Sequence, residues 1–196
     1  MSGPRIDIRT AGEDERPAAV ASVVAAFITD PIARFAYPSV HDYLREMPAA
    51  TNEFAGASFE HGSAWVAADF SGAALWMPPG VHPNGEAFET ILRTTAHPAH
   101  LDDLLGTFEQ MGQCHPDEPH WYLPMIGVEP NAQGRGVGGA LLRHAVERFD
   151  RDRVLAYLES SNPRNIPLYL RHGFVPMGEI RVGSAPVVTP MLRRPR

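Results

Sequence analysis

The chain has 196 residues, of which 44% are hydrophobic and 20% are charged, and its formal net charge is −6. This balance excludes a disordered or fibrous protein and is typical of a globular chain that buries a core. An acidic surface repels phosphate backbones, so we expect no nucleic-acid partner. A single cysteine, Cys114, excludes an internal disulfide framework. With no signal-like segment and no apolar stretch of membrane-spanning length, the sequence predicts a cytoplasmic protein without a membrane partner.

Apolar periodicity predicts the elements of the first half of the chain. Asp30-Pro31 should end the first helix, and Pro48 should interrupt or kink the second. Ser71-Gly72 supplies the turn of a β-hairpin. In chain order we expect a strand at 5–9, helices at 17–28 and 40–54, hairpin strands at 63–70 and 73–77, and helices at 86–95 and 101–111.

The second half of the chain continues with strands and helices. Pro124 lacks an N–H group, so the strand that contains it should carry a bulge or an unpaired edge. No internal repeat and no flexible linker is visible, and we therefore predict one mixed α/β domain over 1–196. We expect a strand at 120–128, a long glycine-opened helix at 134–149, a strand at 154–159, a helix at 163–171, and strands at 174–182 and 187–192.

Four glycines within six residues form the densest signal in the sequence. They occupy positions 134, 136, 138 and 139, after a strand that ends at Val128 and at the start of a helix. Without Cβ atoms, backbone N–H groups can close around an anion, and the helix N-terminus adds partial positive charge. A capping or packing role explains one glycine well but not four. The segment therefore predicts a pyrophosphate-binding loop.

The identity of the phosphate ligand is open to two interpretations. Gly134, Gly136 and Gly139 satisfy the G-x-G-x-x-G pattern of dinucleotide folds, and Glu159 ends the next strand about twenty residues later. In that motif, however, the first glycine directly follows the strand, whereas here residues 129–133 intervene. About sixty residues remain for the further βαβ units of such a fold. A nicotinamide-dependent oxidoreductase is therefore the weaker alternative.

The pattern Gln133-x-x-Gly136-x-Gly138 resembles the pyrophosphate loop of the GNAT superfamily of N-acetyltransferases. A second stretch is similar to another signature of that family: Asn162 precedes Tyr169 by seven positions, and Gly-Phe follows the tyrosine by four and five. Both motifs occur in the family's order and spacing. The resemblance implies an α/β (α+β) fold with a central mixed, mostly antiparallel sheet flanked by helices, whose strands splay at the cofactor site.

Within the superfamily, the chain is similar to the puromycin N-acetyltransferase group. The stretches 36–53 and 81–112 show little similarity, and substrate specificity in the family tends to lie in such regions. The resemblance thus implies a branch of the family without identifying puromycin as the substrate. The similar stretches are 25–27, 74–76, 118–123, 158–161 and 163–165.

The resemblance also implies how acetyl-CoA, the acyl donor, is bound. The strand end at Val128 should pair with the pantetheine arm, and the Val128 N–H is a candidate oxyanion donor. Arg135 could add a charge-assisted contact to a phosphate. Asn162 or Asn165 should contact the arm, although either could instead cap the following helix. The implied cofactor-binding residues are Ile126, Gly127, Val128, Gln133, Gly134, Arg135, Gly136, Val137, Gly138, Gly139, Asn162 and Asn165.

Acetyl transfer to an amine also needs proton transfers. Tyr169 is the general acid that the resemblance implies, because a phenol with a pKa near about 10 can protonate a departing thiolate. Glu159 and His120 are both candidates for the base, and a mechanism without one fixed base stays open. Cys114 has no evident activating group apart from its neighbour His115, so we expect no acetyl-cysteine. His97, His100, His115 and His120 lack metal-ligand spacing, and we predict no metal.

These observations predict an N-acetyltransferase that moves an acetyl group from acetyl-CoA to a primary amine of a small molecule, such as an antibiotic-like or metabolite amine. The reaction would proceed by direct attack in a ternary complex. A non-catalytic acyl-CoA-binding sensor, with the same loop but without transfer, is the alternative from another class. We expect a monomer or a homodimer, and the sequence does not identify the acceptor amine.

Overall fold

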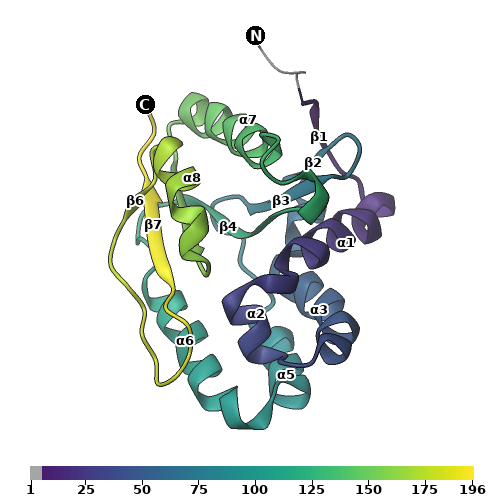
Figure 1. Cartoon of the computed structure of the whole chain (residues 1–196). Helices are drawn as coiled ribbons and strands as arrows, with labels where there is room; N and C mark the ends of the chain where they lie inside the picture. The colour runs from purple at the N-terminus through teal and green to yellow at the C-terminus, as the bar shows by residue number, and fades with distance from the viewer. Residues whose placement is uncertain (1–5) are drawn as a thin grey trace.

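The computed structural model describes residues 6–196, and its centre is a seven-stranded sheet (Figure 1). The strands lie in the order β1-β2-β3-β4-β5-β7-β6. Among these described strands, β4 and β5 run parallel and every other neighbouring pair is antiparallel. The strands are β1 (Ile8–Thr10), β2 (Ala64–Ala67), β3 (Gly72–Met77), β4 (His120–Val128), β5 (Leu155–Ser160), β6 (Val175–Pro176) and β7 (Thr189–Arg193).

Helices cover both faces of the sheet. No helix within residues 6–196 combines the length and the apolar character needed to cross a lipid bilayer. Short 3-10 turns precede or follow several helices, at Glu13–Glu15, Phe27–Thr29, Pro98–His100, Pro130–Ala132 and Pro163–Asn165. The α-helices are α1 (Arg16–Ala26), α2 (Pro31–Ala36), α3 (Val40–Ala55), α4 (Ala57–Glu60), α5 (Gly85–Thr95), α6 (Leu101–Gln113), α7 (Val137–Asp152) and α8 (Ile166–Arg171).

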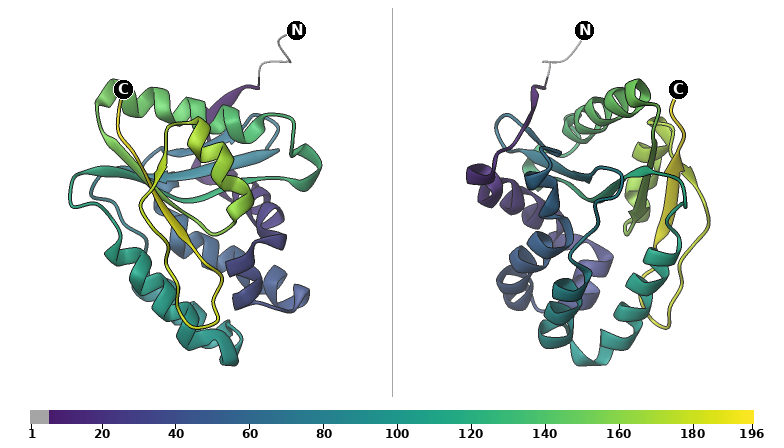
Figure 2. Two further views of the ribbon diagram at one scale, coloured as in Figure 1. Left: turned by 60° about the vertical axis from the view of Figure 1, so that its left-hand side comes forward. Right: turned by 180° about the vertical axis from the view of Figure 1, so that it is seen from behind.

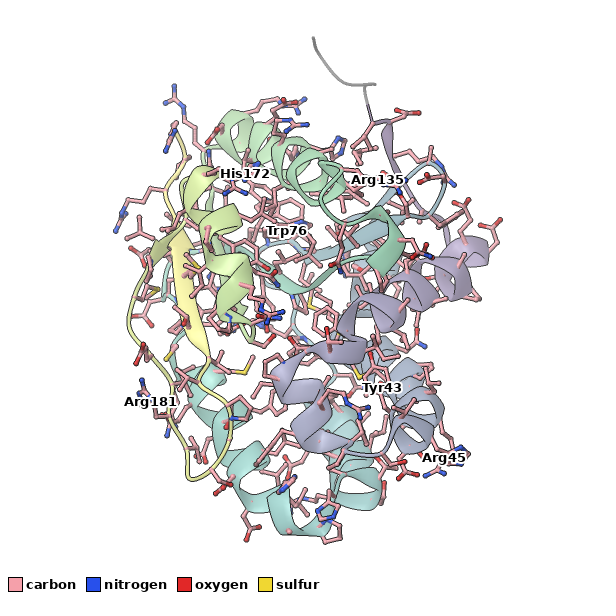
Figure 3. The ribbon with its side chains drawn as sticks, in the orientation of Figure 1. Tyr43, Arg45, Trp76, Arg135, His172 and Arg181 are labelled. Atoms are coloured by element: carbon pink, nitrogen blue, oxygen red, sulfur yellow. The ribbon has the colours of Figure 1, made fainter. Side chains whose placement is uncertain are left out.

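The period-two alternation of the strands directs side chains into two separate cores. Trp65, Trp76 and Trp121 pack on the face that α7 and α8 cover, and Trp76 is seen beneath α7 in Figure 3. Their strand neighbours Val66 and Leu75 face the opposite way, against the helices of the first half of the chain. Figure 2 shows the same division, with α7 and α8 on one side of the sheet and the other helices on the opposite side.

The sheet opens beyond Pro124. Two residue steps of β3 span three of β4 over Tyr122–Met125, so the strand bulges there, as the missing N–H of the proline predicts. The parallel pairing between β4 and β5 ends at the same point, with Leu123 opposite Leu158. From there to Val128, β4 pairs with β3 alone. This splayed edge positions the candidate site.

Most predicted elements are confirmed within a few residues, and the first helical stretch does end before Asp30-Pro31, after a 3-10 turn at Phe27–Thr29. Asp30-Pro31 begins the unpredicted helix α2, because the Asp30 carboxylate caps its N-terminus and Pro31 occupies the first turn. Pro48 does not interrupt α3, which runs through it to Ala55. Leu44, whose carbonyl loses its helical donor at this proline, is 51% exposed, so water can take the place of that donor.

The prediction of a strand at 174–182 was wrong. Only Val175–Pro176 forms a strand, and an isolated bridge joins Ile180 to Val188. Pro176 has no N–H to extend a ladder, and Gly178 has φ +151°. The strand expected at 5–9 is observed from Ile8, and its first residue lies outside the described residues.

Candidate active site

The open edge of β4 forms one wall of a cleft. The Glu129 N–H donates to the Ser71 carbonyl at 2.9 Å, which makes these two a hydrogen-bonded pair. Antiparallel pairs alternate, so in the next pair, Gly72 with Val128, the N–H and C=O groups point away from the partner strand. The same alternation directs the N–H of Ile126 away from β3. Since β5 has already separated, these backbone groups face the cleft.

The N-terminus of α7 lies in the same cleft. Gly136 is the N-cap residue, with φ +89°, and among the described residues no side chain caps this end. Gly134 also has a left-handed φ, of +75°. Side chains are strained at both positions, so the loop needs glycine for its conformation. The unpartnered N–H groups and the dipole of a 16-residue helix together make an anion site.

Two further glycines of the predicted set serve different purposes. A Cβ atom on Gly127 would lie 2.6 Å from the Cβ of Ala26, because α1 crosses β4 at this point. Gly127 is therefore needed for helix–strand packing. A Cβ atom on Gly138 would lie 3.4 Å from Leu168 and 3.6 Å from Val128, which are ordinary contacts. The fold therefore leaves room for a side chain at position 138.

The polar side chains predicted to bind the cofactor have different partners. Gln133 Nε2 donates to the Val128 carbonyl at 3.1 Å and so fastens the loop to the strand end. Asn162 Oδ1 accepts the Arg164 N–H at 3.1 Å, which is a helix-capping role. Asn165 makes no capping hydrogen bond with its side chain to the described residues, although it precedes α8. The Asn162 oxygen is thus used in the cap, whereas the Asn165 side chain has no such role.

One cleft of about 480 Å³ brings together all the predicted cofactor-binding residues except Arg135. Arg135 lines a separate hollow with Asp7 and Asp69, on the side of the loop nearest β1 (Figure 3). The structure thus sets this arginine apart from the site. The cleft is lined by Ala26, Phe27, Thr29, Asp30, Ile126, Gly127, Val128, Ala132, Gln133, Gly134, Gly136, Val137, Gly138, Gly139, Asn162, Arg164, Asn165, Leu168, Tyr169 and Arg171.

Tyr169 lies where this cleft meets a second, apolar pocket, and it lines both. Its ring packs edge-on against Phe174, with centroids 6.2 Å apart. Burial, and secondarily the charge of Asp30, raise the pKa of the Tyr169 hydroxyl above its ordinary value. The phenol therefore holds its proton at neutral pH, as a general acid must.

Asp30 also lines both cavities, and the sequence analysis did not identify it as a site residue. Its Oδ1 accepts the N–H groups of Ile32 and Ala33 at 3.0 and 3.1 Å. Its Oδ2 accepts the Ser161 hydroxyl at 2.5 Å. Burial raises the pKa of this carboxyl. The Asp-Pro helix-start signal could have revealed the cap, but not the contact with a serine 131 positions away.

The apolar pocket lies on the face of the sheet that α2, α3, α5 and α6 cover. Its volume is about 90 Å³, and it shares lining residues with an outer cavity of about 840 Å³. Three aromatic rings line both spaces: Phe88 lies 4.7 Å from Phe54 and 4.9 Å from Phe108, between ring centroids. The apolar pocket thus shares these rings with the outer cavity and shares Tyr169 with the cleft.

Glu159 places a buried carboxylate at the apolar pocket. Its side chain is 1% exposed, and Oε1 lies 3.3 Å from His115 Nε2. Tyr122 and Tyr157 face the same side of the sheet from paired positions of β4 and β5. Burial chiefly raises the pKa of each of these hydroxyls, and the charge of Glu159 raises both further.

The structure places His120 in the outer cavity, away from the cleft and the apolar pocket. Its Nδ1 lies 2.8 Å from the Glu118 carbonyl oxygen and its Nε2 lies 3.0 Å from His115 Nδ1. Burial lowers the pKa of His120, so the ring is neutral at neutral pH. His115, which the sequence analysis did not consider as a site residue, links the two candidate bases.

Cys114 lacks the environment of a nucleophile. Burial, followed by the charge of Glu159, raises the pKa of its thiol above the ordinary value, which disfavours the reactive thiolate. Among residues 6–196, no three histidine, cysteine, aspartate or glutamate side chains gather in a way that could hold a metal ion.

Comparison with known proteins associates this site with acetyl transfer. Residues 96–174, which include the glycine loop and Tyr169, match the model of the acetyltransferase (GNAT) family. An uncharacterized N-acetyltransferase of Schizosaccharomyces pombe is 27% identical over 183 residues, which are 85% of this chain and 73% of the relative. A mycothiol acetyltransferase of Beutenbergia cavernae is 40% identical over 65 residues, 32% of this chain and 22% of that protein.

Solved structures match almost the whole chain and confirm the predicted fold class. One from Corynebacterium glutamicum, described as a histone acetyltransferase and related acetyltransferase, is 27% identical, with a TM-score of 0.68 over 97% of both chains. Arylalkylamine N-acetyltransferase 2 of Aedes aegypti has a TM-score of 0.71 at 13% identity, covering 98% of this chain and 100% of the other. A polyamine N-acetyltransferase of Drosophila melanogaster has a TM-score of 0.67 at 13% identity, covering 97% and 100%.

Proposed function

We propose that this protein, an acyltransferase of the GNAT type, transfers an acetyl group from acetyl-CoA to a primary amine of a small molecule. The amine would attack directly while both substrates are bound. One observation carries the proposal: the open edge of β4 and the uncapped N-terminus of α7 line the same cleft, and Tyr169 joins that cleft to an apolar pocket. Two substrates can therefore meet at the tyrosine from opposite sides.

The cleft offers hydrogen-bonding partners to both polar parts of acetyl-CoA, the pyrophosphate and the pantetheine arm. The N–H groups at the start of α7 would bind the pyrophosphate, whose charge the helix dipole favours. The backbone groups of Ile126 and Val128 would pair with the amides of the pantetheine arm as an added strand does. Asn165 can supply a side-chain contact to that arm. Each contact uses a group that the fold leaves available, except the Val128 carbonyl, which already accepts from Gln133 Nε2.

Three residues would then carry the chemistry. Glu159 takes a proton from the bound ammonium, directly or through one water, so that the neutral amine can attack the thioester carbonyl. The Val128 N–H stabilises the negative charge that develops on the carbonyl oxygen. Tyr169 gives its phenolic proton to the departing thiolate.

Glu159 is a better base than Asp30, although both carboxylates line the apolar pocket. The Asp30 oxygens accept three hydrogen bonds, from two backbone N–H groups and Ser161. Those bonds fix the orientation of Asp30 and occupy its lone pairs. Oε1 of Glu159 has no hydrogen bond of good geometry to the described residues, so it remains able to accept a proton.

The lining of the pocket favours an acceptor whose amine is attached to an apolar, ring-sized body. Phe54, Phe88 and Phe108 would contact that body while the amine reaches Glu159. Amine acetylation by proteins of the same fold supports this choice, since the structural neighbours include arylalkylamine and polyamine N-acetyltransferases. The similarity to the puromycin N-acetyltransferase group supports adding puromycin to the amines tested.

The proposal is tested by two measurements. Acetyl-CoA should raise the melting temperature, because it binds only the native state, and it should release free CoA when a suitable amine is added. The amine panel should contain phenethylamine, tryptamine, agmatine and puromycin, and the aromatic amines should give the highest turnover. Stabilisation by NAD but not by CoA would reject the assignment. Stabilisation by CoA with no turnover across a broad panel would favour an acyl-CoA sensor.

A further inference from the structure

The apolar pocket and the outer cavity have a common border. The pocket has a volume of about 90 Å³ and is lined by Glu159, and the outer cavity has a volume of about 840 Å³. The residues that line both are apolar and come from α3, α5 and α6: Phe54, Phe88, Leu92, Phe108 and Met111. A ligand that reaches from one space into the other would therefore cross an apolar border.

The apolar pocket is too small to enclose the ring of the proposed acceptor. An apolar cavity of about 150 Å³ takes up one benzene molecule. The pocket, at about 90 Å³, has room for an amine and a short linker but not for a ring as well. The ring would then lie at the border, against the three phenylalanines that line both spaces. Any group on the far side of that ring would extend into the outer cavity.

Glu159 sets which end of the acceptor enters the pocket. Its side chain is 1% exposed, and Oε1 makes no hydrogen bond with the described residues. A buried carboxylate without a partner is costly, and an ammonium group supplies both charge and hydrogen-bond donors. The amine end is therefore favoured at Glu159, and the opposite end of the molecule points to the outer cavity.

The outer cavity has a more polar lining than the apolar pocket. On α5, Glu89 and Arg93 each follow a border residue by one position, and both line the outer cavity alone. Arg93 Nη2 lies 2.6 Å from Glu89 Oε1, so these two charges neutralise each other. Three histidines also line this cavity: His82, His115 and His120.

Two carboxylates of α6 have no such partner. Asp102 and Glu109 are seven positions apart, which places them on one face of the helix, and both line the outer cavity. Both are exposed, and neither forms an ion pair or a side-chain hydrogen bond with another residue in the range 6–196. This wall of the outer cavity thus attracts a positively charged group and repels a negatively charged one.

We propose that the two cavities form one site for an elongated acceptor with three parts. The primary amine lies at Glu159, the ring lies against the three border phenylalanines, and a positively charged tail lies in the outer cavity near Asp102 and Glu109. This inference rests on the proposed acetyl transfer. It narrows the acceptor from arylalkylamines in general to those with a cationic group on the side of the ring opposite the amine.

A series of four acceptors tests the three-part arrangement. Phenethylamine is compared with three para-propoxy derivatives whose tails end in a trimethylammonium, a hydroxyl or a carboxylate group. A quaternary ammonium cannot be acetylated, so only the primary amine reacts. We expect kcat/KM to rise about fivefold from the hydroxyl to the trimethylammonium tail and to fall about fivefold to the carboxylate, the range of exposed charge pairs. A preference for the carboxylate tail, or for phenethylamine, would overturn the proposal.

Filling the outer cavity tests the same proposal from the side of the protein. A Cβ atom on Gly112 meets no atom within 4 Å, and Gly112 lines the outer cavity but not the apolar pocket. In Gly112→Trp, KM for the trimethylammonium acceptor should rise about tenfold, with KM for phenethylamine within about twofold of wild type. Gln113→Trp is the matched control, because this exposed neighbour on α6 lines neither space.

Neutralising the wall tests its charge. The double variant Asp102→Asn/Glu109→Gln should turn over the three tailed acceptors with kcat/KM values within about twofold of one another. Glu147→Gln is the control, because Glu147 is exposed on α7, on the other face of the sheet. A double variant that keeps the full preference for the trimethylammonium tail would overturn the assignment of the tail to this wall.

The outcomes separate this inference from the proposed function. If the wild-type protein acetylates phenethylamine but gains nothing from a tail, the three-part site is overturned and the acetyltransferase function stands. If it acetylates no amine, the proposed function fails, and calorimetric titration with the trimethylammonium compound decides the site. Binding that Gly112→Trp weakens and Gln113→Trp keeps would support it, and no binding, or equal binding by both, would overturn it. Should Gly112→Trp not fold, the double variant at exposed positions supplies the comparison.

Discussion

The cleft proposed to bind the cofactor and the pocket proposed to bind the acceptor amine meet at Tyr169, yet different parts of the chain build them. Half of the residues that line the cleft come from the stretch 126–139, whose backbone groups at the strand edge and helix start face it, and the others come from the segments 26–30 and 162–171. The acceptor pocket consists of side chains from many segments between Phe27 and Val188. A backbone site depends on local conformation, and glycines mark it in the sequence. A side-chain site depends on packing between distant segments, which no local motif marks.

The largest expected effect comes from a substitution in the glycine loop, which changes the cleft and leaves the apolar pocket intact. Gly138→Asp places a carboxylate at the anion site, and the fold has room for the side chain. Like charges brought together cost several kcal/mol, so acetyl-CoA affinity should fall about 10³-fold. Calorimetric titration with CoA measures this. Gly112→Asp, at an open position of α6, is the control, and it should bind CoA normally. Normal CoA binding by folded Gly138→Asp would show that the pyrophosphate of CoA does not bind at this loop.

The second prediction compares the two buried carboxylates of the acceptor half. Glu159→Gln should lower kcat about 10³-fold, because the ammonium loses its proton acceptor. Asp30→Asn should change kcat by no more than a few fold, because asparagine can keep the helix cap and a bond to Ser161. Steady-state kinetics of both variants at saturating acetyl-CoA tests the assignment. A larger loss of kcat in Asp30→Asn than in Glu159→Gln would identify Asp30, and not Glu159, as the base.

The third prediction concerns the junction of the two halves. Tyr169→Phe removes one hydroxyl and leaves the ring packed against Phe174, so kcat should fall about 10²-fold. The effect should be smaller than that of Glu159→Gln, because a thiolate can leave unaided whereas an ammonium cannot attack. Stability should change by no more than about 1 kcal/mol, the size of one hydrogen bond. Near wild-type turnover in a folded variant would reject the general-acid role.

The contrast between the halves also explains how much the sequence could predict. The glycine loop, the bulge at Pro124 and the splayed strand are consequences of backbone geometry, which single residue types determine. Alternation even places Tyr157 and Glu159 on one face of β5. These features were predictable because each depends on residues close together in the chain.

The acceptor half resisted prediction for the opposite reason. His115 follows α6 in a loop, and only the folded sheet brings it to Glu159, 3.3 Å away. The Asp30 contact with Ser161 likewise joins residues 131 positions apart. Arg135 is the converse case: its position in the motif predicts a phosphate contact, which stays a prediction, while in the structure its side chain lines another hollow, between two left-handed glycines.

The fourth prediction sharpens the comparison through substrate selectivity. Phe108→Ala removes one of the three rings of the acceptor pocket and leaves the cleft intact. We expect KM for an aromatic amine to rise about tenfold, equivalent to about 1.4 kcal/mol of lost contact, with KM for acetyl-CoA unchanged. Phe35→Ala is the control, because Phe35 stacks on His100 outside the pocket. Equal changes in both KM values would show that the halves are not independent.

The smallest expected effect is on stability, and it tests how burial changes the pKa of Asp30. Burial raises its pKa, so the native state binds this proton more tightly than the unfolded chain does. Its contribution to stability is therefore complete below the unfolded pKa and is lost as pH rises through the folded pKa.

Asparagine at position 30 keeps the cap for Ile32 and Ala33 but carries no charge, so it avoids the cost of burying a carboxylate. The melting temperature of Asp30→Asn relative to the wild type should thus increase between pH 4 and pH 7, by about 2–4 °C for each kcal/mol relieved. Calorimetry of both proteins at matched pH values measures it. If the difference instead shrinks as pH rises, the three hydrogen bonds to the carboxylate outweigh its burial. Asp30 would then be an anion that the native state stabilises. Its lone pairs would be held by those hydrogen bonds, which agrees with the choice of Glu159, and not Asp30, as the base.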